Sequence, residues 1–324
     1  AEMFHPSFSF AAFSIRIAFF HKAFYNRSLH EQNSQKFGSI VPQPIVFEKV
    51  SEIKKEHTMS EPILANYHTH TTRCHHATGT EEAYIETAIR CGYQVLGFSD
   101  HTPWRYRNPH FVSHIRMLPD ELEGYVQTLQ ALRDRYADRI HLHIGLEVEY
   151  FPAYLDRFAE DCERLGVEYW VFGCHYDTTD ETGIHFGRSH SDLDLRHYAE
   201  QVAAGLETGR YLYLAHPDLF LNRWPEFDAA AEKTCREICE AAARLDVPLE
   251  YNLAGLQTHG RADGSLGYTN DLFWQIAAEY PVKAILGCDA HAPEELDVVP
   301  LLRSKQEYLR GLGIPVLDHL PQLA

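Results

Sequence analysis

Seven short apolar runs recur along the chain after residue 59, and stretches with helical spacing separate them. The runs cover residues 63–70, 94–101, 140–150, 168–175, 211–218, 248–255 and 283–291. Apolar residues recur at helical intervals between these runs, as in 80–92, 119–137, 192–209 and 226–246. Strands that alternate with helices form a parallel sheet. The order therefore predicts an α/β fold whose sheet closes into a barrel.

Each of these runs ends in side chains that can bind a metal ion or move a proton. They are His68, His70, Asp100, His101, Glu147, His175, His216, Asp218, Asn252, Asp289 and His291. In a parallel barrel the carboxyl ends of the strands meet at one face, where active sites are built. Residues two apart in a strand point to the same side, so His68 and His70 can both face this mouth. We therefore expect the functional site at the carboxyl ends of the strands.

Four residues at or near these strand ends allow more than one role. His75 and His76 are adjacent, so at most one of them is expected to face the mouth. Asp218 can either bind a metal ion or cap the segment that follows it. Glu149 shares a face with Glu147, and we expect it to form a salt bridge or to lie at the rim.

The donor types in this set indicate divalent metal ions. Imidazole and carboxylate without thiolate suit Zn²⁺, Mn²⁺ or Fe²⁺. A catalytic zinc takes about three protein ligands, so the number of candidates indicates two or three ions that share a carboxylate. Metal ions about 3.5–4 Å apart stabilise the attacking and leaving oxygens of a phosphoryl displacement. The pattern predicts a metal-dependent enzyme that acts on phosphate esters.

Seven motifs carry these side chains, in the order HTHTTRCHHATGTEEAYIETAI, GFSDHTPW, GLEVEY, GCHY, AHPDLF, LEYNLAGL and GCDAHAPEEL. From about Asn66 to the C-terminus they resemble the histidinol-phosphatases of the polymerase and histidinol phosphatase (PHP) superfamily. The resemblance implies a distorted (β/α)7 TIM-like barrel with three metal ions at the carboxyl ends of the strands. It also implies hydrolysis of L-histidinol phosphate to L-histidinol and phosphate, a reaction of histidine biosynthesis.

Carried over by motif, the resemblance implies three metal positions. The first would use His68, His70, Asp289 and a bridging Glu147. The second would share Glu147 and use His175 and His216. The third would use His76, His101 and His291. His76 is chosen over His75 because the family's histidine directly precedes an alanine, which is Ala77 here.

We expect a metal-activated hydroxide to attack phosphorus in line. Asp100 is a candidate for the acid that protonates the leaving group, or for a group that orients a ligand imidazole. A guanidinium matches two phosphate oxygens. Arg116 and Arg223, in the loops after the second and fifth predicted strands, are favoured over Arg188 and Arg261 for this role.

Residues 1–58 differ in composition from the rest of the chain. They contain nine of the 18 Phe residues and no Asp. The apolar stretch 8–24 is too short and too interrupted by polar residues to span a bilayer. We expect Met59 to be the natural start, with 1–58 an N-terminal extension outside the fold and 59–324 one PHP phosphatase domain.

The net charge and the cysteine content limit the kinds of binding partner and the cellular compartment that we expect. The chain has 46 acidic and 29 basic residues and a formal charge of −17, opposite to what binding of nucleic acid requires. Its seven cysteines show no paired spacing, which indicates reduced thiols in a cytoplasmic protein. We expect a small phosphate ester as the partner, without nucleic acid or membrane.

Three other functions remain as alternatives. The first is hydrolysis of another small phosphate ester, because the Gly-rich segment GLQTHGRADGSLGYTND lies where it can reshape the substrate pocket. The second is a nuclease or proofreading module, which the acidic charge disfavours. The third is a non-catalytic metal-binding barrel, which the complete set of ligand candidates disfavours.

Overall fold

The computed structural model describes residues 63–323 and contains an eight-stranded parallel sheet. The strands pair in chain order: β1 (Ala65–Asn66), β2 (Val95–His101), β3 (His141–Val148), β4 (Tyr169–Phe172), β5 (Tyr213–Leu214), β6 (Leu249–Asn252), β7 (Ala284–Gly287) and β8 (Val316–Leu317). The predicted α/β class and parallel sheet are confirmed. The two-residue strand β8 was not predicted. The expectations for residues 1–58 and for Met59 lie outside the described residues.

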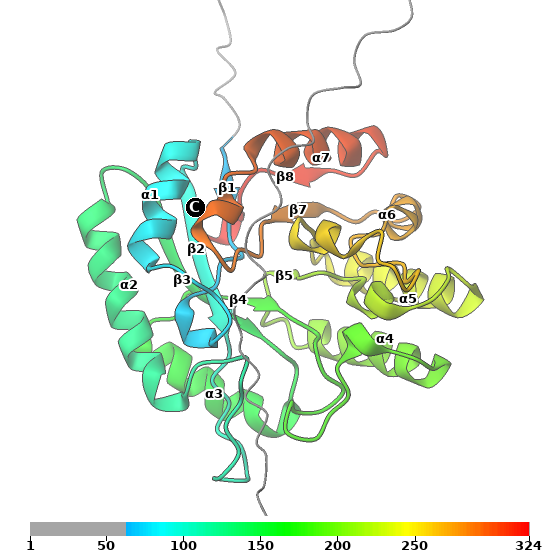
Figure 1. Ribbon diagram of the computed structural model, residues 1–324, viewed down its shortest axis with the longest axis horizontal. Coiled ribbons are helices and arrows are strands. Elements are labelled where there is room, and N and C mark those ends of the chain that lie inside the picture. The colour runs from blue at the N-terminus through cyan, green and yellow to red at the C-terminus, as the bar shows by residue number, and fades with distance from the viewer. Residues whose placement is uncertain (1–62, 324) are drawn as a thin grey trace, which may run out of the picture. The chain divides into compact units, whose positions relative to one another are not determined.

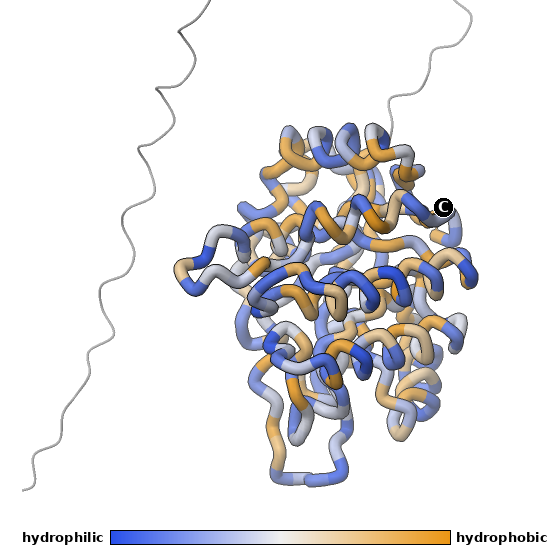
Figure 2. The backbone as a smooth tube through the Cα atoms, turned by 90° about the vertical axis from the view of Figure 1, so that its right-hand side faces the viewer, coloured by the Kyte–Doolittle hydropathy of each residue, from blue (hydrophilic) through white to orange (hydrophobic). Residues whose placement is uncertain are grey.

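A helix follows each of the first seven strands, as in the predicted barrel. The helices are α1 (Glu81–Cys91), α2 (Leu122–Tyr136), α3 (Pro152–Leu165), α4 (Asp192–Glu207), α5 (Ala229–Leu245), α6 (Asp271–Ala277) and α7 (Val299–Gly311). They surround the curled sheet, and the colours in Figure 1 follow the chain around it in order. Hydrophilic and hydrophobic residues alternate along the helices, as Figure 2 shows, because one face of each packs on the sheet.

Local sequence explains where two of these helices begin. The Thr80 side chain caps α1 by accepting a hydrogen bond from the backbone N–H of Ala83 at 3.2 Å. Helix α4 begins at Asp192, and the residue before it, Ser191, is its cap. Ser191 accepts from the backbone N–H of Asp194, whose carboxylate accepts from the Ser191 N–H in return.

Strands β2, β4, β6 and β7 are buried along their whole length, which is typical of parallel sheets covered by helices. Inside the barrel, Tyr169 fills the space below the functional face. Its hydroxyl donates to the backbone oxygens of Tyr67 at 2.8 Å and of Phe98 at 3.2 Å. Gly97 and Gly145 leave room for the ring, because a Cβ at either position would collide with it. This packed floor fixes the strands whose ends carry the polar side chains.

Within the described part of the chain, no helix has the length and apolar character that crossing a membrane requires.

Candidate metal centre

The side chains expected to bind metal ions lie together at the carboxyl ends of six strands. Eight of the nine are in these strands or directly after them: His68 and His70 after β1, His101 in β2, Glu147 in β3, His175 after β4, His216 after β5, and Asp289 and His291 after β7. The ninth, His76, follows the short 3₁₀ turn at Thr72–Cys74. Distances between their side chains connect all nine into one cluster.

Glu147 occupies the centre of the cluster. Its Oε1 atom lies 2.9 Å from His216 Nε2 and 3.1 Å from His175 Nε2. Its Oε2 atom faces the other side, 3.0 Å from His101 Nδ1 and 3.5 Å from His68 Nε2. Each carboxylate oxygen therefore meets a different group of imidazoles, which is the arrangement that a bridging ligand needs.

Asp289 completes the group around His68 and His70. Its Oδ1 atom lies 3.4 Å from His68 Nε2 and 3.0 Å from His70 Nε2. Asp289 has a backbone φ of 51°, and His216 has a φ of 29°. Non-glycine residues rarely adopt positive φ, and doing so costs about 1–3 kcal/mol each. Both strained residues point their side chains into the cluster, so the strain coincides with the functional site.

Two buried glutamates orient histidines of the cluster. Glu250 Oε1 lies 2.8 Å from His68 Nδ1, and Glu149 Oε1 lies 3.1 Å from His175 Nδ1. When Nδ1 donates its proton to a carboxylate, Nε2 keeps its lone pair for a metal ion. Glu250 was not predicted from the sequence. Its place two residues before Asn252 in β6, on the same side of the strand, was the available signal.

His76 and His291 face each other with their Nε2 atoms 3.0 Å apart. Each Nδ1 atom is held by a backbone oxygen, that of Cys74 at 2.7 Å and that of Asp289 at 3.0 Å. Burial lowers the pKa of His291 to about 4, so its ring is neutral at pH 7. Two lone pairs then point at the same space, and a cation between them removes their repulsion.

Buried nitrogens without partners test whether metal ions fit this site. Within the described residues some of these atoms lie near carboxylate oxygens, but none of them forms a hydrogen bond of suitable geometry: His68 Nε2, both ring nitrogens of His70, His101 Nδ1 and His216 Nδ1. Buried polar atoms are nearly always paired. Although burial opposes it, Glu147 and Glu149 raise the pKa of His175 to about 10, so these two carboxylates favour a positive charge beside them. Divalent ions would satisfy both the nitrogens and the carboxylates.

Four sets of three donors have ligand atoms close enough to share an ion: His68, His70 and Glu147; His101, Glu147 and His175; His76, His101 and His291; and His70, Cys74 and His291. Burial raises the pKa of the Cys74 thiol to about 12, which disfavours the thiolate that metal binding requires. The first three sets use only residues expected from the sequence.

Asp100 is buried beneath the cluster and is held by hydrogen bonds. It accepts from the backbone N–H groups of Thr71 at 3.2 Å and His101 at 2.8 Å, and from the Thr71 hydroxyl. Its Oδ1 atom lies 3.6 Å from His70 Nδ1. Burial opposes ionisation, but His70 and Thr71 lower the pKa of Asp100 overall. A carboxylate held ionised in this way favours the orienting role over that of a proton donor.

Arg116 lies in surroundings that differ from those expected of a phosphate-binding residue. Its guanidinium is buried and donates to both oxygens of Glu149, at 2.9 and 2.6 Å, and to Asp180 at 3.2 Å. These carboxylates occupy the fork that a phosphate would need. The structure therefore argues against phosphate binding by Arg116 and makes it a support for Glu149, which forms the salt bridge expected of it.

Arg223 and Asp218 also have defined partners. The half-exposed Arg223 forms an ion pair with Asp263. Within residues 63–323, no ion pair joins it to any of the nine clustered side chains. Asp218 accepts hydrogen bonds from the backbone N–H groups of Thr269 at 3.0 Å and Asn270 at 2.7 Å. Asp218 therefore does not cap the segment that follows it, Leu219–Arg223, which receives no capping hydrogen bond from this side chain. It holds instead the chain just before α6.

Replacement of Glu250 tests the orienting contact. In the Glu250→Gln variant, His68 loses its charged partner, and we expect metal affinity to fall roughly 10- to 100-fold, as is usual for such contacts. Titration of the metal-free protein with Zn²⁺ measures it. Glu237→Gln, on the outer helix α5, is the matched control. Equal affinities for the two variants would remove Glu250 from the site.

Comparisons with known proteins agree with this geometry. The PHP domain family matches residues 66–254, more than half of the chain. A "Probable histidinol-phosphatase" of Deinococcus radiodurans is 28% identical over 244 residues, covering 72% of this chain and 88% of that protein. A protein with the same description from Schizosaccharomyces pombe is 23% identical over 269 residues, covering 77% of this chain and 87% of that one.

A solved structure shares the fold. Histidinol phosphate phosphatase (HisK) of Lactococcus lactis, solved with zinc, L-histidinol and phosphate, superposes with a TM-score of 0.57. The two are 17% identical, and the match covers 78% of this chain and 95% of that one. The parallel sheet and the family match over residues 66–254 lead to one conclusion: this chain belongs to the PHP domain family.

Proposed function

We propose that this protein is a metal-dependent phosphomonoesterase that hydrolyses L-histidinol phosphate to L-histidinol and phosphate. The observation that carries the proposal is the cluster around Glu147, where buried imidazole nitrogens lack partners and converge on shared carboxylates. The descriptions of the two relatives and the ligands of the Lactococcus lactis enzyme supply the substrate.

We infer three divalent ions, Zn²⁺, Mn²⁺ or Fe²⁺, in this cluster. His68, His70 and Asp289 would hold the first, His175 and His216 the second, and His76, His101 and His291 the third, with Glu147 shared between the first two. When bound, such ions lower the pKa of a coordinated water and offset the charge of phosphate oxygens. All nine donors are oxygen or imidazole nitrogen, which these ions accept.

The remaining side chains prepare the site for this chemistry. Glu250 and Glu149 fix the rings of His68 and His175, and Asp100 lies against His70. Such contacts keep each ring in the tautomer that presents its free nitrogen to the site. Preorganised groups of this kind need no rearrangement when charge develops in the reaction.

The cluster is open to solvent on one side, so a small ester can reach it. The side chains of Asp289 and His175 are each 11% exposed, and that of His291 is 26% exposed, while those of His68 and His70 are fully buried. We therefore infer that the phosphate enters from the side of His76 and His291, where the donors are most accessible.

Free thiols agree with a cytoplasmic location, which we also propose. All seven cysteines are unpaired, and six of them are buried. Disulfides are usual in oxidising compartments and rare in the cytoplasm.

A substrate panel tests the proposed reaction. We expect the kcat/KM for L-histidinol phosphate, on protein loaded with Zn²⁺ or Mn²⁺, to exceed that for other small phosphate esters by at least about tenfold. A difference of this size needs only about 1.4 kcal/mol of differential transition-state binding. Preference for another ester would agree with a phosphatase reaction but would contradict L-histidinol phosphate as the substrate and a role in histidine biosynthesis.

A further inference from the structure

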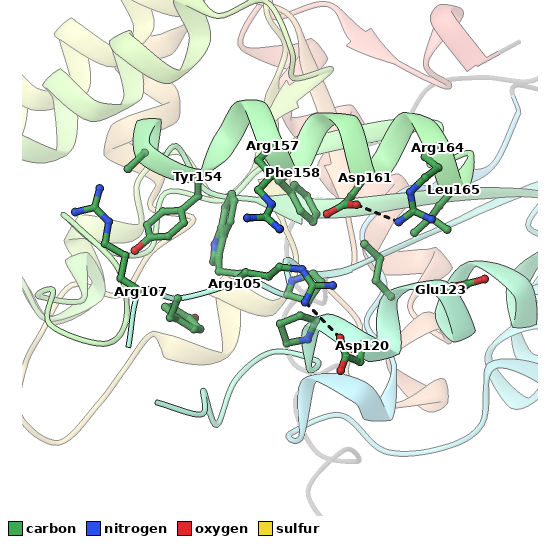
Figure 3. Close-up of a pocket in the computed structure, with 16 residues that line it drawn as sticks. Arg105, Arg107, Asp120, Glu123, Tyr154, Arg157, Phe158, Asp161, Arg164 and Leu165 are labelled. Atoms are coloured by element: carbon green, nitrogen blue, oxygen red, sulfur yellow. Dashed lines mark hydrogen bonds and ion pairs between the residues drawn. The ribbon is translucent and has the colours of Figure 1, made fainter. Parts of the chain in front are cut away.

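A groove rich in arginine runs along α3, apart from the clustered metal-binding candidates. It has a volume of about 580 Å³ and lies between α3, the segment 103–107 that follows β2, and the beginning of α2. Figure 3 shows Arg157 extending from α3 toward the segment that carries Arg105. None of the nine metal-binding candidates lines this groove.

Two of the four arginines in the groove have no ion-pair partner. The other two are paired: the guanidinium of Arg105 lies 3.3 Å from the carboxylate of Asp120, and that of Arg164 lies 3.0 Å from the carboxylate of Asp161. Arg107 and Arg157 also line the groove but form no ion pair with any residue between 63 and 323. The chain as a whole carries a net charge of −17. Two unpaired guanidinium groups in one groove are therefore a local exception to the acidic character of the protein. Guanidinium binds carboxylate or phosphate through two parallel hydrogen bonds.

Aromatic side chains form one wall of the groove. Trp104 and Phe158 are buried in its wall with their ring centroids 5.1 Å apart, and Tyr154 lies 6.0 Å from Trp104. The Trp104 indole donates a hydrogen bond to Glu149 at 3.1 Å, which fixes its orientation. Trp104 and Phe158 are buried, so the half-buried Tyr154, which packs against Trp104, is the ring that a ligand in the groove can reach. A planar ligand ring can stack on it.

We propose that this groove binds a small organic anion that carries a planar ring. The carboxylate or phosphate of the ligand contacts Arg107 and Arg157, and its ring lies against Tyr154. The volume is within the range of small-molecule sites, roughly 300–1,000 Å³. The site is separate from the proposed catalytic cluster, and the proposal does not depend on the reaction catalysed there.

Calorimetric titration of the metal-loaded protein tests this site. The probe is adenosine 5′-thiomonophosphate, which has a ring and an anion and resists hydrolysis. We expect wild-type protein to bind it more tightly than adenosine, which lacks the anion, or inorganic phosphate, which lacks the ring. Arg157→Ala should raise the Kd about tenfold, the usual scale for loss of a charge-assisted contact. Arg303→Ala, an exposed arginine of α7 without an ion pair, is the matched control and should leave the Kd unchanged.

Three results would overturn the proposal. The first is no binding of the probe by wild-type protein at millimolar concentration. The second is a Kd that changes equally in Arg157→Ala and Arg303→Ala. The third is binding that survives in Arg107→Ala and Arg157→Ala but is lost in Glu147→Gln, which would place the anion at the metal centre. Arg107 and Arg157 are exposed, so their replacement leaves the core intact.

Discussion

Glu147→Gln should lower kcat/KM for phosphate release by well over a hundredfold and reduce the metal content of the protein. Groups that only orient a metal ligand typically contribute roughly 10- to 100-fold. Glu147 contacts the imidazoles on both sides of the cluster, through different oxygens. Glutamine keeps the shape but replaces one oxygen with an NH₂ group, which cannot bind a cation. Steady-state kinetics and elemental analysis of the same preparation measure both effects.

The control for this variant is Glu240→Gln, an exposed glutamate of α5 that forms no ion pair with any described residue. It changes the net charge equally and should leave both activity and metal content as in the wild type. If Glu147→Gln kept its full metal content and activity, the proposed role of Glu147 as a shared metal ligand would be wrong.

Arg116→Ala should lower the free energy of unfolding by about 3–5 kcal/mol, the usual cost of removing one partner of a buried ion pair. The guanidinium is fully buried between Glu149 and Asp180. Its loss removes the charged partner of Asp180 and leaves Glu149, among the described residues, with His175 alone as an ion-pair partner. Although burial opposes ionisation, Arg116 holds the pKa of Glu149 well below its usual range, so this carboxylate is charged when the partner disappears. Urea denaturation followed by circular dichroism measures the change.

An exposed pair provides the comparison. Arg310→Ala removes a partner of Asp318 at 3.1 Å, where both side chains are about a third to a half exposed. Such a pair contributes about 0–1 kcal/mol. Equal stability of Arg116→Ala and Arg310→Ala would show that the buried ion pair is not formed. Retention of stability together with loss of phosphate binding would restore the role expected for Arg116 from the sequence.

The sequence was most informative where a pattern repeats locally. Alternating strands and helices determine the parallel sheet, and parallel strands bring their carboxyl ends to one face. That rule alone predicted that His68, Glu147 and Asp289 would meet, although 221 residues separate the first from the last (289 − 68). The start of α1 at Thr80 was also predictable, because a cap depends on residues three positions apart.

Contacts between distant residues were less predictable. Glu250 lies 182 positions from His68, and Asp180 lies 64 positions from Arg116. A guanidinium can bind phosphate as readily as carboxylate. Only the folded structure shows that the Arg116 guanidinium is already bound by Glu149 and Asp180. Strand β8 escaped prediction because it has two residues, both only partly buried. Short elements of this kind depend on pairing with a neighbour, here β7.

Phosphate release from L-histidinol phosphate before chelation, after chelation and after return of Zn²⁺ or Mn²⁺ tests the central claim most directly. The account predicts that chelation abolishes the activity and that the metal restores it, because the buried imidazole nitrogens without hydrogen bonds are available to metal ions, which would activate the attacking water. Activity that persists in the fully chelated protein would contradict the account, as would a reloaded protein that releases no phosphate from this ester.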